Sequence, residues 1–450
     1  MSDLGDVAPI YGKIQGHLNR EEIDVAARMA NELLNEDPKD SIALFMFAQA
    51  MNAADKRGVA YNLYQQVVHY SPKLAEAWNN LGGTLKYMGR NDEMERHFMK
   101  SMKLDPKAPH PYNNMGVIRV EQKRPEEALE YCQKAIEIDP KDPFNYETRS
   151  FARLMLGDWG GFDDYEACLH TGTRLSRAYG PEPAWNGEKG KTVIIHTEQG
   201  LGDEIMFAQL FERAIKDCKK VVIDCDPRVK GLFKRSFPNT EVHGTRHQKE
   251  GIEWLDGLKP DYHCAAGSLY RLYKDKWNTG RFLVPDENRK KAFSSLLSKD
   301  KPNIGLAWRG GKLNTGSKKR SFTLDIFKDI MKQDANFVSL EYMPVNEGID
   351  HFPWITEKGV DYDNAMALVD CLDLIISVPT TIVHAAGALG KECWVITPHE
   401  CNWRFQKEGE SMPFHDSLKL YRQSEAWADT IKEVERDLNG YIESFYRARS

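Results

Sequence analysis

Residues 191–211 read KTVIIHTEQGLGDEIMFAQLF, and this stretch decides how the second half of the chain folds. Thr192–Ile195 is a short apolar run typical of a buried strand, and the residues from Asp203 onward are typical of a helix. Between them, Gly200 and Gly202 lack a Cβ atom, so the backbone there is able to approach a ligand closely. The first N–H groups of the following helix favour an anion. The stretch therefore predicts a strand, a glycine turn and a helix that together form a binding geometry.

After this unit, the rest of the chain alternates between short apolar runs and helical patterns. This alternation predicts doubly wound parallel sheets in two lobes, one at residues 191–290 and one at residues 291–450. The expected strands are Thr192–Ile195, Lys220–Asp224, Glu241–His243 and Tyr262–Cys264, then Asn303–Trp308, Phe337–Leu340, Leu374–Val378 and Glu392–Thr397. The expected helices include Pro227–Phe237, Leu324–Met331, Ala365–Cys371, Ile382–Leu389 and a C-terminal helix. Pro285 and the charged run after it suggest a hinge between the lobes.

A second strand–turn–helix unit lies in the run DLIISVPTTIVHAAGALGKECWVITP, residues 373–398. Its turn is Pro379, Thr380 and Thr381, and its helix is built of small residues, so the helix is able to lie close on the sheet. The helix N-terminus again favours an anion. Two lobes that each present such a turn form a cleft between them, where sheets of this kind bind ligands.

The first part of the chain carries a repeat of 34 residues. Pro38, Pro72, Pro106 and Pro140 are spaced at this period, and three of them end the similar runs NEDP, KLDP and EIDP. Counting from each proline aligns large residues with small ones four positions later, and then a second set of small and large residues. The aligned sets are Leu44, Trp78, Tyr112 and Tyr146; Ala48, Gly82, Gly116 and Ser150; Ala60, Met94 and Ala128; and Tyr64, Phe98 and Cys132. The pattern predicts two packed antiparallel helices per repeat, closest at the small positions.

This pattern resembles the tetratricopeptide repeat family over residues 41–142, with a degenerate first unit before them and a last half-unit at residues 143–170. We expect a helical array over residues 1–170, followed at residues 171–190 by a polar, glycine- and proline-rich linker or docking extension. Arrays of this kind offer a concave face, so the default role is recognition of a peptide or protein. The alternatives are that the array packs on the next domain or forms a homo-oligomer.

Composition limits the class of protein. The 450 residues indicate two to four domains, and 41% hydrophobic with 28% charged residues is ordinary for a soluble globular protein. The formal charge, 61 − 67 = −6, argues against a general nucleic-acid binder. No apolar run has the length of a membrane span, and the N-terminus lacks the features of a signal peptide, so we expect a cytoplasmic protein. The eight scattered cysteines without a CxxC pair predict free thiols rather than disulfides or a zinc site.

A dinucleotide site is the first alternative for Gly200 and Gly202. Asp224 or Asp226 lies at a suitable distance to hold a ribose, but position 205, where the third glycine of GxGxxG belongs, is Ile. No Walker lysine follows the glycines, so a P-loop is excluded. The sequence therefore does not favour a nicotinamide cofactor, and it predicts no metal ligand set.

The basic loop after the strand Asn303–Trp308 is favoured as a contact for phosphate over a merely solvated run of charge. Its charged residues are Arg309, Lys312, Lys318, Lys319 and Arg320. His384, about one turn into the small-residue helix, is either a buried histidine bonded to a backbone carbonyl or a donor contact.

Asp203 is the first acid to test as a catalytic base. An Asp at a helix N-terminus is commonly only a cap. Here, however, it stands on the glycine loop, where it has the chance to accept a proton from an attacking hydroxyl. Glu204, His196 and Glu198 are weaker candidates.

Residues 191–440 as a whole resemble GT-B glycosyltransferases of the heptosyltransferase type, and more closely a group that joins tetratricopeptide repeats to such a domain. The runs that carry the resemblance are QGLGDEIMFAQ, IGLAWRGG, KRSFTLDIF, FVSLE, DLIISVPTTIVHAAGALGKECWVITP, NWRF and LYRQSEAW. The layout is also similar to that of the O-linked N-acetylglucosamine transferases. The resemblance implies a pair of Rossmann-like lobes, with the acceptor at the N-terminal lobe and a nucleotide-sugar donor at the C-terminal lobe.

The resemblance also implies roles for particular residues. Gln199, Gly200 and Gly202 would face the acceptor, with Asp203 in the position of the base. The donor would be held by Thr380, Thr381 and His384 of the second turn and helix, by the basic residues Arg309, Lys312, Lys318 and Arg320, and by Glu341 at the ribose. Enzymes of this type invert the anomeric centre by direct displacement and have no obligatory metal or other cofactor.

Two positions depart from the family. Pro379 stands where an Asp usually precedes the Thr of the second turn, and Asn402 stands where relatives usually have an acid, in DWRW. A carboxylate lost from the donor site implies a different sugar or a domain that binds without turnover. We therefore expect an inverting glycosyltransferase that acts on a hydroxyl of a protein or glycan recruited by the repeats. The alternative is a non-catalytic repeat scaffold with a degenerate nucleotide-sugar site.

Overall fold

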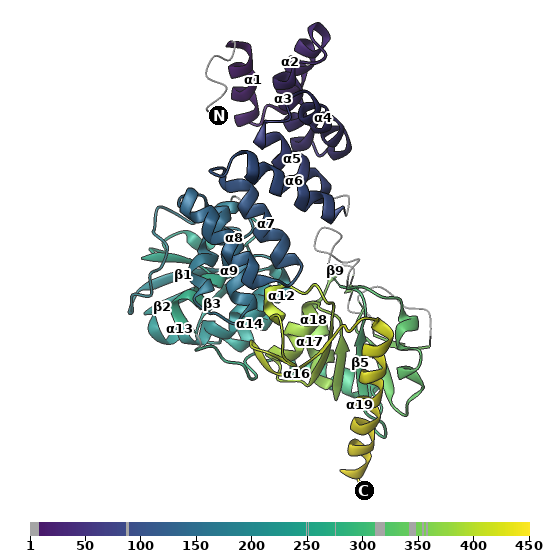
Figure 1. Ribbon diagram of the computed structural model, residues 1–450. Coiled ribbons are helices and arrows are strands. Elements are labelled where there is room, and N and C mark those ends of the chain that lie inside the picture. Colours follow the sequence, from purple (N-terminus) through teal and green to yellow (C-terminus); the bar gives the residue numbers. More distant parts are fainter. Residues whose placement is uncertain are drawn as a thin grey trace. The chain divides into compact units, whose positions relative to one another are not determined.

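The computed structural model describes residues 9–86, 90–248, 250, 252–274, 276–310, 320–341, 348–352, 355–356 and 359–450. The chain divides into two compact units, one of Met1–Val120 with Arg124–Arg149 and one of Glu121–Lys123 with Ser150–Ser450. The first unit is helical, and the second combines helices with largely parallel sheets (Figure 1). The chain is thus a helical repeat array followed by an α/β region, as predicted at this level.

The helices of the first unit follow one another in pairs joined by short turns (Figure 1). They are α1 (Pro9–Asn19), α2 (Ile23–Glu36), α3 (Ser41–Ala53), α4 (Arg57–Tyr70), α5 (Ala75–Leu85), α6 (Asn91–Leu104), α7 (Pro109–Glu121), α8 (Pro125–Ile138) and α9 (Pro143–Met155), which crosses the division between the units. Each proline-containing turn separates two pairs, because proline cannot continue a helix and breaks it there.

The predicted close approach at the small repeat positions is confirmed. A Cβ atom at Gly82 would lie 2.7 Å from the Phe98 ring, and one at Gly116 would lie 3.0 Å from the Cys132 sulfur. These are the small and large positions that the repeat period aligns. Glycine is required there because the second helix of the pair occupies the space that a side chain would need.

The large position of the repeat also has a hydrogen-bonding role. In three repeats its side chain donates to the carbonyl of the proline that precedes its helix: Trp78 Nε1 to Pro72 (2.9 Å), Tyr112 Oη to Pro106 (3.4 Å) and Tyr146 Oη to Pro140 (2.9 Å). Each bond links the first helix of a repeat to the turn that precedes it. The aromatic residue and the proline therefore recur at the same 34-residue period because they contact each other.

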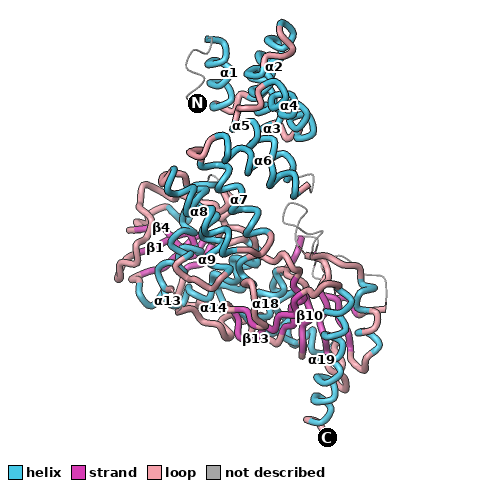
Figure 2. The backbone as a smooth tube through the Cα atoms, in the orientation of Figure 1, coloured by secondary structure: helices cyan, strands magenta, loops and turns pink. Residues whose placement is uncertain are grey.

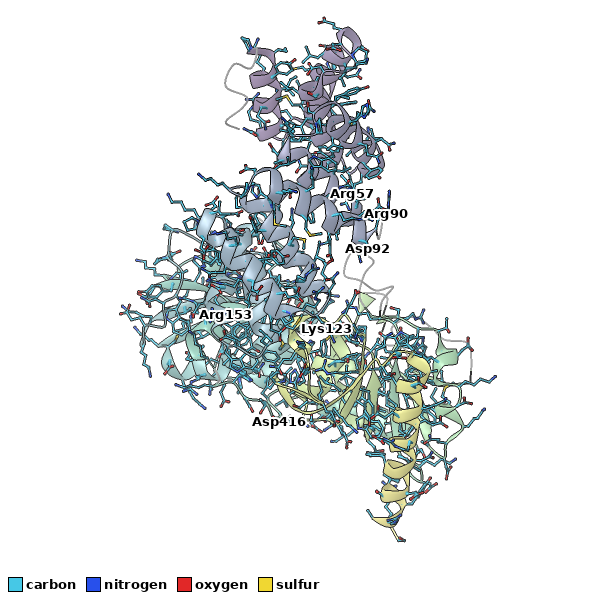
Figure 3. The ribbon with its side chains drawn as sticks, in the orientation of Figure 1. Arg57, Arg90, Asp92, Lys123, Arg153 and Asp416 are labelled. Atoms are coloured by element: carbon cyan, nitrogen blue, oxygen red, sulfur yellow. The ribbon has the colours of Figure 1, made fainter. Side chains whose placement is uncertain are left out.

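The second compact unit contains the chain from Ser150 onward, together with Glu121–Lys123. Arg153, labelled in Figure 3, pairs with Asp158 (2.7 Å) and Asp164 (3.1 Å) and so connects α9 to the short helices that follow. These are α10 (Gly161–Asp164), a 3₁₀ turn η2 (Tyr165–Ala167) and α11 (Cys168–Thr171).

Aromatic packing explains why this segment belongs to the α/β region. The Phe162 ring stacks on Tyr270 at 4.7 Å between centroids and contacts Trp403 at 6.0 Å edge to face. Tyr165 likewise contacts Trp403, at 5.6 Å. These ring contacts hold the segment against residues that belong to both sheet-bearing parts of the second unit. The segment is therefore packed on the α/β region.

Residues 171–190 form a docking extension rather than a free linker. Ala184 makes an isolated parallel bridge with His263, and Trp185 donates its backbone N–H to the His263 carbonyl at 2.8 Å. Trp185 and Arg174 are buried. The segment therefore runs along the edge of the first sheet.

The first sheet has the strand order β3-β2-β1-β4, with every pairing parallel. The neighbouring strands β1 and β4 are labelled in Figure 2. Its strands are β1 (Thr192–His196), β2 (Lys220–Asp224), β3 (Glu241–His243) and β4 (Tyr262–Ala265). Its helices are α12 (Leu201–Phe207), α13 (Phe211–Asp217), α14 (Lys230–Ser236) and α15 (Leu269–Tyr273). The central strand β1 carries the buried run Val193–Ile195, and its carboxyl end leads into the glycine turn.

The second sheet, within the described residues, has the order β12-β13-β11-β10-β5-β6-β7, parallel except for the β12 pairing. Its strands are β5 (Asn303–Ala307), β6 (Asn336–Ser339), β7 (Asp350–His351), β10 (Leu374–Ser377), β11 (Cys393–Thr397), β12 (Ser411–Met412) and β13 (His415–Arg422), and β8 (Ile355–Thr356) pairs separately with β9 (Gly359–Val360). The pattern β7-β6-β5-β10-β11-β13 is the doubly wound order, which reverses direction between β5 and β10.

Helices cover both faces of the second sheet, as strands buried on both sides require. Alternate strand residues such as Ile304, Leu306 and Ile376 pack with α19 (Trp427–Arg447) in one hydrophobic cluster. On the other face lie α18 (Thr381–Ala388) and α17 (Tyr362–Cys371), with α16 (Glu287–Leu296) packed on α17. Because α16 belongs to this part, the predicted lobe boundary after residue 290 falls inside a helix.

Three local predictions differ from the structure. The expected helix Leu324–Met331 consists of two 3₁₀ turns, Leu324–Phe327 and Ile330–Lys332. The first-lobe helix begins at Leu201 rather than Asp203, because Gly200 serves as its N-cap. Strand β13 was not predicted, since its exposed side chains interrupt the apolar run.

Candidate functional site

The two strand–turn–helix units meet in the second unit of the chain. We call residues 197–203 the first turn and residues 378–381 the second turn. A Cβ atom at Gly202 would lie 3.1 Å from the His384 ring and 3.4 Å from the Cα of Thr381. The absence of a side chain at Gly202 thus permits α12 to approach the start of α18. Gly202 does permit a close approach, but the neighbour that the structure shows there is the second turn rather than a ligand.

The second turn is held to the loop after β5. The carbonyl of Pro379 lies 2.9 Å from the place where a Cβ of Gly310 would stand, and the Arg320 side chain borders the same glycine at 3.4 Å. Thr380 caps α18 by accepting a hydrogen bond from the Ile382 N–H at 3.1 Å. The ends of β5 and β10, where the strand order reverses, therefore lie against the first turn.

Among the residues that the structure describes, the Asp203 carboxylate contacts two partners. One carboxylate oxygen accepts from the Gly200 N–H at 3.1 Å, which is the capping role, and the other pairs with Nη2 of Arg404 at 2.5 Å. The Asp203 side chain is 20% exposed. The structure thus shows the cap that sequence reasoning treated as the alternative, and adds an ion pair.

Arg404 was not among the predicted site residues, although it lies in the quoted run NWRF. It comes from the 3₁₀ turn η11 (Trp403–Phe405), and its Nη2 also donates to Gln199 Oε1 at 2.9 Å. Its guanidinium lies 4.5 Å from the centre of the Trp403 ring. Burial opposes its charge, but Asp203 outweighs that effect and raises the pKa of Arg404. A single arginine between two aromatic residues gives no sequence signal for a contact with Asp203.

Gln199 is held in an uncommon backbone conformation. Its φ of 62° lies in the left-handed region, which a residue with a side chain rarely adopts. Its Nε2 donates to the Tyr165 hydroxyl at 2.8 Å, and its carbonyl accepts from Arg246 at 2.8 Å. Strain of this kind persists only where the surroundings fix it, and it is frequent at functional sites.

Glu204 lies buried behind the first turn. Burial raises its pKa to about 7, against the opposing charge of Arg246, with which it forms an ion pair. Its Oε2 accepts from the Asp226 N–H at 3.0 Å. Glu204 therefore supports the turn from inside the first sheet and has no exposed surface from which to reach a substrate.

Glu198 and His196, the other weaker candidates, are also interior residues. Glu198 receives Arg174 Nη2 at 2.6 Å and the Gly267 N–H at 3.0 Å, and both side chains of the Glu198–Arg174 ion pair are fully buried. Burial lowers the pKa of His196 to about 3, so it is neutral at physiological pH. Both residues hold the carboxyl end of β1 in place.

The predicted donor-side residues fall into three groups. Arg309 pairs with Glu341 at 3.1 Å, and Glu341 also accepts from the backbone N–H groups of Trp308 (2.8 Å) and Arg309 (2.9 Å), so the carboxylate binds the loop after β5. Arg320 borders Gly310 in the loop after β5, and its pKa is lowered by burial and then by the charge of Arg404. Lys312, Lys318 and Lys319 lie outside the described residues.

His384 is a buried histidine whose partner is another histidine rather than a backbone carbonyl. Its Nδ1 lies 3.4 Å from Nε2 of His415. Burial, followed by the charge of Arg404, lowers the pKa of His384 to about 3. A neutral ring beside Gly202 offers hydrogen bonding and shape but no positive charge.

The two acids considered for a ribose contact already have partners. Asp224 is buried and accepts from Arg177 (2.9 Å), Tyr179 (2.8 Å) and Thr245 (2.7 Å). Asp226 pairs with Arg228 at 2.8 Å, and hydrogen bonds from Arg228 outweigh the effect of burial and lower its pKa. These contacts bind the docking extension and the loops around β2 to one another.

The cysteine side chains form no disulfide bond among the residues that the structure describes. All eight cysteines are free thiols, buried or half-buried, as predicted. Among the residues that the structure describes, no group of three or more His, Cys, Asp or Glu side chains is placed to hold a metal ion. Among the same residues, no helix is both long enough and apolar enough to cross a membrane.

Comparisons with known proteins address the repeats directly. Tetratricopeptide repeat family models match residues 75–107 and 111–142. The chain therefore carries tetratricopeptide repeats at the positions where the proline period predicted them. The family models cover only this part of the chain.

One curated relative spans both parts of the chain. Protein FlbA of Caulobacter vibrioides is 26% identical over 485 aligned residues, which cover 99% of this chain and 80% of FlbA. Among solved structures, MamA matches 36% of this chain and 94% of its own at 17% identity and a TM-score of 0.31. PilF of Pseudomonas aeruginosa matches 51% of this chain and 91% of its own at 17% identity and a TM-score of 0.35.

Proposed function

We propose that the chain is an inverting glycosyltransferase that transfers a sugar from a nucleotide-sugar donor to a hydroxyl group. The observation that carries the proposal is the meeting of the two turns, with Asp203, Arg404 and Arg320 gathered beside them. An acid that is able to accept a proton and two cations that are able to neutralise a diphosphate are the groups that displacement at a sugar requires.

Strand order supports a GT-B arrangement of two Rossmann-like lobes. The first sheet reverses direction between β1 and β4, and the second between β5 and β10. Ligands of doubly wound sheets bind beyond the carboxyl ends of the strands at such reversal points. Both turns lie at these ends, so a ligand bound to one sheet would also meet residues from the other.

In the proposed reaction the acceptor hydroxyl oxygen attacks the anomeric carbon of the donor. The new carbon–oxygen bond forms as the bond to the nucleoside diphosphate breaks, Asp203 takes the hydroxyl proton, and the diphosphate leaves with the bonding electrons. Thr380, Thr381 and the N-terminus of α18 would hold the diphosphate with Arg320, Lys312 and Lys318. Arg309, Glu341 and His384 would border the donor, and Gln199, Gly200 and Gly202 the acceptor.

In this proposal the repeat array recruits the acceptor. Tetratricopeptide repeats are a protein-binding architecture, so a protein, or a glycan carried by one, is the acceptor class that fits. The proposal includes no metal, because the chemistry of leaving-group neutralisation is assigned to arginine and lysine side chains and to backbone N–H groups.

A non-catalytic scaffold is the second candidate function. It is favoured by the engagement of both Asp203 oxygens in protein contacts and by Pro379, which is buried at the second turn. The glycosyltransferases that this region resembles usually have an acid at that place. A scaffold would retain the repeat surface and bind partners without turnover.

Calorimetric binding of UDP, GDP, ADP, CMP and their sugar conjugates to the full chain tests the proposal. We expect one nucleotide family to bind and its sugar conjugate to be consumed in the presence of a cell extract that contains acceptors. Asp203→Ala should abolish transfer while nucleotide binding persists. Absence of binding by every nucleotide would favour the scaffold, and unchanged turnover in Asp203→Ala would remove the assignment of the base.

A further inference from the structure

The ion pair between Arg404 and Asp203 joins segments that lie 201 positions apart in the sequence, as the residue numbers give (404 − 203). Arg404 follows the loop after β11 of the second sheet, whereas Asp203 lies in the first turn of α12 beside the first sheet. The Arg404 side chain is 12% exposed. A nearly buried arginine that crosses from one sheet-bearing part to the other is costly unless its donors are used.

Those donors are only partly used. The same atom, Nη2, serves both Asp203 and Gln199, whereas Nε is buried and has no hydrogen-bond partner among the described residues. Guanidinium groups bind carboxylate and phosphate most strongly through two parallel N–H bonds. The contact with Asp203 is therefore weaker than the one Arg404 is able to make with a better-placed anion.

A second arginine, Arg320, lies near Arg404. Arg320 lies close enough for the charge of Arg404 to lower its pKa, after the larger effect of burial. Tyr165 and His384 border the same residues, and both are neutral, because burial raises the pKa of Tyr165 and lowers that of His384.

We propose that Arg404 exchanges partners: it pairs with Asp203 in the unliganded protein and with the donor diphosphate when the donor binds. The inference rests on the proposed transferase function and assigns a role to a residue outside the predicted donor set. The diphosphate would draw the guanidinium away and leave the Asp203 carboxylate without its ion pair. The base would thus become available to the acceptor hydroxyl only when a donor is present, so the donor binds first.

The exchange predicts how three variants bind phosphate-containing ligands. Arg404→Gln should weaken binding of a nucleoside diphosphate and of inorganic pyrophosphate by about tenfold or more, because it removes a charged hydrogen bond to phosphate. It should leave the affinity for the matching nucleoside, which has no phosphate, unchanged. Asp203→Asn should tighten diphosphate binding, because Arg404 no longer has to leave a carboxylate. Arg404→Lys should restore part of the lost affinity, since lysine keeps the charge but not the fork geometry.

A matched control is available at the other end of α18. Arg281 pairs with Asp370 at 2.8 Å and donates to the carbonyl of Leu389, which follows the helix. Arg281→Gln also breaks an arginine–aspartate pair, so it reports any loss of affinity that follows from destabilisation alone. We expect its diphosphate affinity to equal that of the wild type.

Isothermal titration calorimetry on the full chain, with nucleoside diphosphate, pyrophosphate and nucleoside, distinguishes the outcomes. Selective loss of phosphate-dependent affinity in Arg404→Gln together with tightening in Asp203→Asn supports the exchange. Equal diphosphate affinity in Arg404→Gln and wild type overturns it and leaves the transferase proposal standing, as does weaker binding by Asp203→Asn. If neither diphosphate nor pyrophosphate binds the wild type, both proposals fail.

Discussion

The first and second turns follow the same plan, a parallel strand that ends in a turn and a helix, yet their polar groups are satisfied in different ways. The first turn and its flanks carry Glu198, Asp203 and Glu204, and each of these acids pairs with an arginine from a distant segment. The second turn has no charged residue, and Thr380 caps its helix locally. The first turn is therefore positioned by tertiary contacts, whereas the second forms from its own short sequence.

This difference suits the two halves of the proposed reaction. A base must be placed to within a fraction of an ångström, and charged partners from several segments achieve that placement. A diphosphate cradle needs mainly backbone N–H groups and small side chains, which a short turn before a helix provides by itself. Perturbing the distant arginines should therefore damage the first turn far more than local changes damage the second.

The largest expected effect comes from Arg174→Ala. Arg174 is fully buried against Glu198, and its removal leaves an uncompensated carboxylate in the interior, which costs about 3–5 kcal/mol of unfolding free energy. Urea unfolding followed by circular dichroism measures the change. Replacing both partners with apolar residues, Arg174→Met with Glu198→Leu, should recover much of the loss. Arg436→Ala removes an exposed ion pair and serves as the control. If Arg174→Ala is no more destabilising than Arg436→Ala, the first turn does not depend on its buried ion pairs.

The two turns should also respond to pH in opposite directions. Burial raises the folded pKa of Glu204 to about 7 from 4.5, so its contribution to stability is present below pH 4.5 and is lost as pH rises through 7. Burial lowers the folded pKa of His384 to about 3 from 6.5, so its contribution is present above pH 6.5 and is lost as pH falls toward 3. Each effect amounts to at most about 1.4 kcal/mol per pH unit.

Glu204→Gln and His384→Gln separate these effects. Relative to the wild type, the first variant should lose less stability between pH 5 and 7, and the second should lose less between pH 6 and 4, when unfolding free energies are measured by urea titration at each pH. Slopes that shift in the same direction for both variants would contradict the assigned environments. Lys432→Gln, at an exposed position of α19, should leave the wild-type slopes unchanged.

A smaller effect is expected at the second turn itself. Thr380→Ala removes the acceptor for the Ile382 N–H and should cost about 1 kcal/mol, the usual value for loss of an N-cap. Thr380→Ser keeps the acceptor and should be close to wild type in thermal unfolding. If Thr380→Ala lowers stability as much as Arg174→Ala does, the second turn depends on tertiary contacts too, and the contrast with the first turn disappears.

The same contrast explains which features could be predicted from sequence. Strand β1, the second turn and the repeat helices follow from short-range patterns: apolar runs, turn residues and a fixed proline period. Close packing at Gly82 and Gly116 followed from that period as well. These features depend on residues near one another in the chain, or on a spacing that repeats.

What could not be predicted depends on distant partners. Arg404 and Tyr165 reach the first turn from opposite sides in sequence, and neither lies in a motif that marks a contact with Asp203 or Gln199. The contacts of the segment after α9 were not predicted for the same reason, because Phe162 is held by rings of the α/β region rather than by the repeat period. Residues 312 and 318 of the basic loop remain predictions, since they lie outside the described part of the chain.

The smallest expected effect comes from Asn402→Asp, which tests whether Asn402 influences the contact between Arg404 and the first turn. The Oδ1 atom of Asn402 accepts from the Arg404 N–H at 3.0 Å, so Asn402 caps the 3₁₀ turn that presents Arg404. Asn402→Asp keeps this acceptor and adds a charge at an exposed helix start, so unfolding free energy should change by less than about 0.5 kcal/mol. Diphosphate affinity should also stay within about twofold, because the capping geometry that orients Arg404 is preserved. A large loss of affinity would mean that a charge at position 402 acts on Arg404 directly, and the position would then tune the balance between Arg404 and Asp203.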